Sequence, residues 1–165
     1  MPEYSQERIE SLIDGDIPWD DAKEMMSSYK DSDRFVKYRD VLQERADWEE
    51  TILLPLTDHL YVVAGDDGRV VKCDCGQEFG DYRENWKHEA LINVRDSEED
   101  LQEVYPEAMH SDPDWMVLRE FFCPGCHRQL EVESVPPGYP LVFDFRPYVD
   151  EFYEEWIGQP APDKQ

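Results

Sequence analysis

The sequence predicts an α+β protein in which a helical N-terminal arm precedes a small, mostly antiparallel β domain built around four cysteines. Three observations lead to this class. Apolar residues recur at helical spacing up to about residue 47, the period changes to that of strands from Thr51, and the cysteines form two close pairs. A chain of 165 residues is long enough for one such domain with an extension, and short for two catalytic domains.

Three short amphipathic helices are predicted for the arm, residues 1–50. The first ends at Gly15, the second begins after Pro18 with acidic residues in its first turn, and the third runs to Arg45. Such apolar stripes are usually core, although three helices ahead of a compact domain also suit docking on a partner subunit. The stripes are Ile9, Leu12 and Ile13; Trp19, Ala22, Met25, Met26 and Tyr29; and Phe35, Tyr38 and Leu42.

The β domain is predicted to span residues 51–135, with an insertion at 77–122. Its strands are expected at 52–54, 60–64, 69–72, 86–94, 115–122 and 128–135. Gly65-Asp66-Asp67-Gly68 is a hairpin signal between the second and third of these strands. A short acidic helix is expected from Ser97, its N-cap, to Met109.

Residues 136–165 are predicted to form a proline-rich C-terminal docking segment. Aromatic residues within 141–145 and 152–157 alternate there with acidic ones. Aromatic side chains are favoured at interfaces. Each tryptophan taken singly is nevertheless expected in the core: Trp19, Trp48, Trp86, Trp115 and Trp156.

The composition is strongly acidic. The chain has 40 Asp and Glu against 16 Lys and Arg, a formal net charge of −24. Such a field repels nucleic-acid phosphates and anionic lipid, so neither a nucleic acid nor a membrane surface is an expected partner. The sequence has no apolar run of about 18 residues and no signal-peptide pattern, which indicates a cytoplasmic protein with reduced thiols.

Cys123-Pro124-Gly125-Cys126 is the stronger half of a predicted metal site. It lies between two predicted strands, and Pro and Gly permit the tight turn that aims both sulfurs at one ion. The other half, Cys73 and Cys75, is weaker because only one residue separates the two thiols.

Residues 76–122 separate the two pairs, a longer stretch than the roughly 15 to 20 residues of a compact zinc ribbon. This length implies an insertion but does not forbid a shared site. The predicted site is zinc-ribbon-like, with Cys73, Cys75, Cys123 and Cys126 as ligands of one structural Zn²⁺, or of a single iron ion. Four unliganded thiols, or a redox pair of Cys123 and Cys126, are the alternatives.

The other polar residues predict neither a catalytic residue nor a cofactor-binding residue. His127 follows the last cysteine and could replace it as a ligand, but a solvent-facing position is favoured. His59, His88 and His110 have no sequence-local partner for nucleophilic chemistry, and the chain carries no phosphate-binding glycine loop or nucleophile elbow.

With these residues in view, the chain resembles the small gamma subunits of the acetone carboxylases and related ATP-dependent ketone carboxylases over nearly its whole length. The order and spacing of the matching segments carry the resemblance. They are residues 12–15, 34–36, 42–45, 52–56, 73–76, 85–87, 94–96, 119–126 and 152–158.

The resemblance implies a hetero-oligomer with two larger subunits, alpha and beta, similar to the hydantoinase and oxoprolinase group. In that family ATP activates both the ketone and bicarbonate to give a 3-oxo acid, acetoacetate in the case of acetone. ATP and a catalytic divalent metal are then expected on the partner subunits, and the small subunit is implied to be a structural, zinc-carrying component.

Two other classes remain open from the sequence. One is a free-standing zinc-ribbon-like module whose acidic face recruits a basic protein. The other is a small redox or metal-trafficking protein, which would need cycling thiols or an exchangeable metal.

Overall fold

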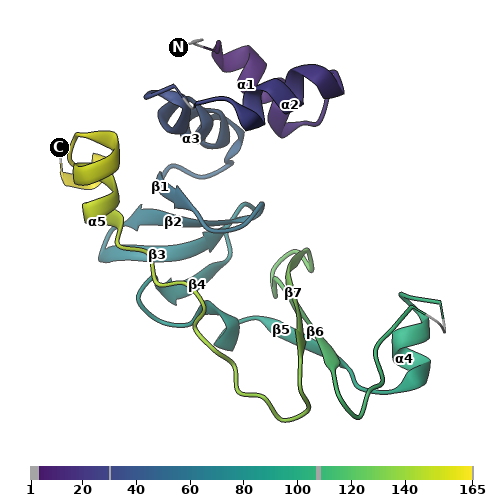
Figure 1. The fold of residues 1–165 in the computed structure, drawn as a ribbon. Helices are drawn as coiled ribbons and strands as arrows, with labels where there is room; N and C mark the ends of the chain where they lie inside the picture. The colour runs from purple at the N-terminus through teal and green to yellow at the C-terminus, as the bar shows by residue number, and fades with distance from the viewer. Residues whose placement is uncertain (1–3, 30, 107–108, 165) are drawn as a thin grey trace. The chain divides into compact units, whose positions relative to one another are not determined.

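A computed structural model describes residues 4–29, 31–106 and 109–164 of the chain (Figure 1). The fold is α+β, as predicted, with helices in the first third and antiparallel strands after them. The chain divides into two compact units, a helical unit of Met1–Leu54 with Tyr148–Gln165 and a β unit of Pro55–Pro147. Within the described ranges, no helix has the length and apolarity needed to span a membrane.

The three predicted N-terminal helices are present. They are α1 (Gln6–Ile13), α2 (Trp19–Ser27) and α3 (Arg34–Arg45). Ser5 caps α1 because its hydroxyl accepts a hydrogen bond from the backbone N–H of Arg8 at 3.3 Å. Gly15, with φ +69°, follows the end of α1, where the left-handed region suits glycine.

The first helices of this unit are joined by a small apolar core and by two ion-pair groups. Tyr4, Ile9 and Met25 are buried together. The guanidinium of Arg45 on α3 binds both carboxylate oxygens of Asp14, at 2.7 and 2.9 Å, beyond the end of α1. Asp31 is almost fully buried, and one of its oxygens accepts a hydrogen bond from Nε of Arg34 at 2.7 Å.

The C-terminal residues complete the helical unit. The single turn α5 (Val149–Glu151) runs into the π-helical segment η2 (Phe152–Ile157), and the 3-10 turn η3 (Pro162–Lys164) follows. Tyr153 is fully buried, and its hydroxyl donates to the carbonyl of Leu53 at 2.8 Å and accepts from Arg39 at 3.3 Å. These bonds join the ends of the chain within one unit.

Several predicted core side chains are exposed. The stripe on α2 buries Ala22 and Met25, whereas Trp19 is 71% and Met26 66% exposed. Of the tryptophans, Trp86 is buried as predicted, but the prediction is wrong for others. Those that are at least 70% exposed are Trp19, Trp115 and Trp156. The apolar stripe on α2 is wider than the face of this short helix that is buried, so helical spacing alone placed too many of its side chains in the core.

Two antiparallel sheets contain all the described strands. The first, in the order β1-β2-β3-β4, consists of β1 (Thr51–Pro55), β2 (Leu60–Gly65), β3 (Gly68–Cys73) and β4 (Glu78–Asp81). The second, in the order β5-β6-β7, consists of β5 (Leu91–Arg95), β6 (Val117–Phe122) and β7 (Gln129–Val135). The predicted hairpin is present, with Gly65 opposite Gly68 and Leu60 opposite Cys73.

Three details of the β unit differ from the prediction. The sequence did not indicate β4, a short strand of only four residues. The strand predicted for residues 86–94 begins at Leu91, because Trp86–His88 forms the 3-10 turn η1, capped by the Asn85 side chain. The acidic helix α4 (Glu98–Gln102) has the predicted Ser97 cap but ends well before Met109; residues 107–108 lie outside the described ranges.

The core of the β unit draws on both sheets and on both cysteine pairs. Trp86 packs edge-on against Phe79 of β4 and Phe121 of β6, with ring centroids 6.0 and 5.9 Å apart. The full set of buried residues in this core is Leu60, Val71, Cys73, Phe79, Trp86, Phe121, Cys123 and Leu130.

Lys87 is a buried cation next to this core, with only 2% of its side chain exposed. Its ammonium donates to Glu131 on β7 at 2.9 Å and also contacts the carboxylates of Glu133 and Asp144. Burial lowers the pKa of this lysine, but the hydrogen bonds to three carboxylates outweigh burial and raise the pKa above its ordinary value. Lys87 is therefore charged and links η1, β7 and the 136–147 segment.

Asp31→Asn should lower the free energy of unfolding near pH 7 by about 1–3 kcal/mol, because Arg34 then loses its ionised partner. Burial raises the pKa of Asp31, but its bond to Arg34 prevails and the pKa lies below the ordinary 3.8. The native state therefore favours the ionised form, so the stabilisation is present above that value and is lost as the pH falls below it.

Urea unfolding of wild type and variant between about pH 2.5 and 7 measures this difference. The free energies of unfolding of wild type and variant should converge at the acidic end of this range. The exposed hairpin variant Asp67→Asn serves as the control, and an Asp31→Asn deficit that is independent of pH would contradict the assignment.

Candidate metal centre

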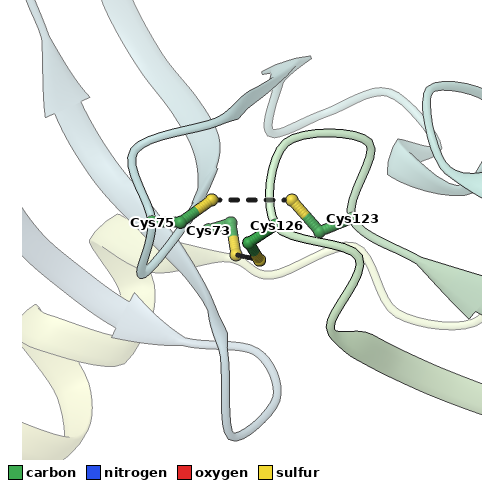
Figure 2. A group of neighbouring side chains, drawn as sticks. All are labelled: Cys73, Cys75, Cys123 and Cys126. Atoms are coloured by element: carbon green, nitrogen blue, oxygen red, sulfur yellow. Dashed lines mark hydrogen bonds between the residues drawn. The ribbon is translucent and has the colours of Figure 1, made fainter.

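The four predicted cysteines converge on one point of the β unit (Figure 2). Their sulfurs all lie within 4.8 Å of one another. The sulfurs of Cys73 and Cys126 are 3.9 Å apart, and those of Cys75 and Cys123 are 3.6 Å apart. Both of these contacts run between the two pairs, which is the arrangement of a shared site.

These distances suit a single tetrahedral ion. A zinc–thiolate bond of about 2.3 Å places the corners of an S₄ tetrahedron about 3.8 Å apart. The two sulfur separations between the pairs, 3.6 and 3.9 Å, lie on either side of that value. A disulfide requires sulfurs about 2.05 Å apart, and the four cysteines are free thiols here.

Two backbone turns of the same design position the sulfurs. In the first knuckle, residues 73–77, the N–H of Cys73 donates to the carbonyl of Gln77 at 2.8 Å. In the second knuckle, residues 123–128, the N–H of Cys123 donates to the carbonyl of Arg128 at 2.9 Å. The first turn closes with one residue fewer, so the spacing that made this pair the weaker prediction still allows a complete knuckle.

The residue after the second cysteine is left-handed in both knuckles. Gly76 has φ +92° and His127 has φ +59°, the one non-glycine residue with positive φ in the described chain. Glycine meets this requirement without strain, whereas a histidine there is uncommon. Nothing in the sequence indicated that His127 occupies the position equivalent to Gly76.

Gly125 allows the two knuckles to approach each other. A Cβ atom at this position would lie 3.2 Å from Cβ of Gln77 and 3.5 Å from Sγ of Cys75, both in the first knuckle. A side chain at Gly125 would therefore crowd the first knuckle.

The environment of the thiols differs within each pair. Cys73 and Cys123 are buried, while Cys75 and Cys126 are exposed. Burial raises the pKa of Cys73 and Cys75 above the ordinary value. Burial acts in the same direction on Cys126, but a backbone hydrogen bond from Arg128 and contacts with the other thiols outweigh it, so its pKa is lowered. A bound cation would supply the remaining stabilisation that four neighbouring thiolates need.

Charged residues surround the cysteines. The carboxylate of Asp74, between Cys73 and Cys75, lies 3.0 Å from Nδ1 of His59 and forms an ion pair with Arg128 of the second knuckle. This pair joins the two knuckles outside the sulfurs and places a positive group beside a site of net negative charge. Sequence spacing could not have indicated it, because the three residues are distant in the chain.

Among the described residues the sulfur group includes no histidine, although His59 contacts Asp74 between two of the cysteines. His127 is exposed and does not belong to the sulfur group, as expected, and His88 is exposed as well. Among the described residues the other group with metal-ligand geometry consists of Glu131, Glu133 and Asp144. The ammonium of Lys87 already lies among those carboxylates.

Comparison with known proteins agrees with the resemblance seen in the sequence. The family model for the acetone carboxylase gamma subunit matches residues 46–157, which include both knuckles. The chain is 41% identical to the acetone carboxylase gamma subunit of Xanthobacter autotrophicus over 163 residues, 98% of this chain and 97% of that protein. It is 37% identical over 79 residues to the acetophenone carboxylase beta subunit of Aromatoleum aromaticum, 47% of this chain and 61% of that protein.

Reciprocal substitutions after the second cysteine of each knuckle should have opposite effects. His127→Gly should raise the free energy of unfolding by up to about 1 kcal/mol, because it removes a side chain from a left-handed position. Gly76→Ala should lower it by about 1 kcal/mol or more, since the alanine is forced to φ +92°.

Denaturant unfolding of the two variants, measured at equal metal content, tests this comparison. Gly80→Ala, another position of positive φ outside the knuckles, is the control for backbone strain alone. A stabilising effect of Gly76→Ala would contradict the proposed equivalence of the turns.

Proposed function

Because the chain belongs to the acetone carboxylase gamma subunit family, we propose that it is the small, structural, zinc-binding subunit of a hetero-oligomeric, ATP-dependent ketone carboxylase. The complex converts a ketone and bicarbonate to a 3-oxo acid, which is acetoacetate if the ketone is acetone. Two larger subunits of the hydantoinase and oxoprolinase type, alpha and beta, carry ATP and the catalytic divalent metal. The assembly is cytoplasmic.

The observation that carries the structural role is the closed character of the cysteine site. Four thiolates complete the coordination of a tetrahedral ion, so no position is left for water or substrate. A catalytic zinc site in contrast keeps one position open. In this proposal Cys73, Cys75, Cys123 and Cys126 therefore hold a metal that stabilises the fold, and the chemistry takes place on the other chains.

The choice of zinc rests on the ligands and their spacing. Soft thiolates in a set of four select zinc or a single iron ion, and the sulfur separations fit a metal–sulfur bond of about 2.3 Å. Zinc needs no redox partner, which agrees with a structural role. Within the proposal, the binding energy of the ion contributes directly to the stability of the β unit.

Co-expression of this chain with the larger carboxylase subunits of the same organism tests the function. A stable complex with equal amounts of the three subunits and about one zinc per small subunit is expected, with ATP-dependent ketone carboxylation by the complete assembly. Native mass spectrometry, elemental analysis and product formation from labelled bicarbonate are the measurements. A zinc-bearing monomer that does not bind the larger subunits would instead favour a free-standing acidic binding module.

Cys123→Ser should abolish stoichiometric zinc and lower the free energy of unfolding by about 4 kcal/mol, because a buried metal ligand is lost. Elemental analysis and urea unfolding measure the two effects. His88→Ala, which changes an exposed histidine of the same unit, is the matched control. A Cys123→Ser variant that is metal-free and equally stable would disprove the structural role of the metal.

A further inference from the structure

The strand β5 forms one edge of the three-stranded sheet in the β unit. Among the described strands its only neighbour is β6, and β7 forms the opposite edge (Figure 1). The backbone N–H and C=O groups on the outer side of an edge strand can pair with a strand of another chain. Both edges of the sheet thus have the potential for strand addition.

The apolar side chains of β5 are exposed on both faces of the sheet. Leu91 is 48%, Ile92 39% and Val94 42% exposed. Successive side chains in a strand point to opposite faces, so apolar surface is exposed above and below this edge. Natural proteins usually protect a free edge with charges, prolines or bulges, and an unprotected apolar edge indicates a binding surface.

The polar side chains of β5 do not protect its edge, because they are used inside the sheet. Asn93 donates to a carboxylate oxygen of Glu120 on β6 at 2.8 Å, and Nε of Arg95 donates to the same oxygen at 2.7 Å. Another nitrogen of Arg95 pairs with Glu103 at 2.7 Å. The polar side chains of the strand are thereby paired within the chain.

The opposite edge, β7, has the protection that β5 lacks. Its pairing with β6 contains a register shift between Phe121 and Phe122, and its Glu131 and Glu133 bind Lys87, so that other parts of the same chain already contact this strand. The β5–β6 register is continuous from Leu91 to Arg95. One sheet therefore contains both a guarded edge and an open one, and the open edge is β5.

The charge of the chain identifies the kind of occupant. A second copy also carries a formal charge of −24, so self-pairing brings two strongly acidic chains together. The segment Asp96–Asp100, directly after β5, adds four carboxylates beside the edge. A strand with apolar side chains and basic residues at one end complements this surface, whereas a second copy does not.

We propose that β5 is the docking edge for a strand of a larger carboxylase subunit, which extends the β5-β6-β7 sheet and places basic residues against Asp96–Asp100. This inference rests on the proposed function, since the occupant is one of the partner subunits. Backbone hydrogen bonds to β5 fix the position of the added strand, and Leu91, Ile92 and Val94 pack against its side chains.

Val94→Lys in the full chain tests the surface, because a lysine on an edge strand opposes strand addition and its exposed position keeps the fold intact. Val132→Lys is the matched control, since Val132 is also exposed (48%) but lies on the guarded strand β7 of the same sheet. Binding to the purified larger subunits should weaken about tenfold or more for Val94→Lys and stay within about twofold of wild type for Val132→Lys.

Hydrogen exchange supplies a second readout, because strand addition protects amides of residues 91–95 in the complex relative to the free chain. A Val94→Lys variant that binds the larger subunits as tightly as wild type overturns the docking edge and leaves the subunit function standing. Wild type that does not assemble overturns both. A free chain that dimerises, and loses its dimer on Val94→Lys, overturns the choice of occupant.

Discussion

The convergence of four sulfurs is the constraint on which the β unit depends. The unit contains strands of two separate sheets, and one buried cluster draws its residues from both. Cys73 ends a strand of the first sheet, Cys123 follows a strand of the second, and both belong to the same buried cluster. Four thiolates less than 5 Å apart repel one another unless a cation lies between them. The proposed ion therefore adds to the apolar cluster in holding the two sheets together.

Ion pairs made by the few basic side chains form a second set of constraints on the fold. The chain has far more carboxylates than basic side chains, and two of its least exposed basic groups connect elements distant in sequence. Lys87 joins β7 and the 136–147 segment, and Arg119 on β6 pairs with Glu133 at 2.7 Å. Removing the cation of such a group leaves neighbouring carboxylates in mutual repulsion. These ion pairs accordingly provide cross-links in a chain whose surface is dominated by one sign of charge.

Sequence reasoning recovered the parts of the structure that depend on local pattern. The helical period predicted α1 to α3, the Gly-Asp-Asp-Gly signal predicted the β2–β3 hairpin, and cysteine spacing predicted which thiols converge. It missed features that depend on neighbours distant in the chain. Residues 86–88 leave the strand conformation because Trp86 fills the core between two sheets and Lys87 reaches the carboxylates of β7. The left-handed turn at His127 is set by the knuckle and not by the residue itself.

The exposed aromatic residues were misassigned for a related and informative reason. A helical stripe or a single tryptophan indicates surface that must be covered, but it does not say by which chain. Trp19 and Trp156 stay largely exposed although the helical unit has its own core, and the same is true of the apolar edge of β5 in the other unit. A high net charge keeps such surface from associating with further copies of the same chain. The acidity thus permits an apolar surface to persist until a partner of different charge covers it, as expected for a subunit that is complete only in its assembly.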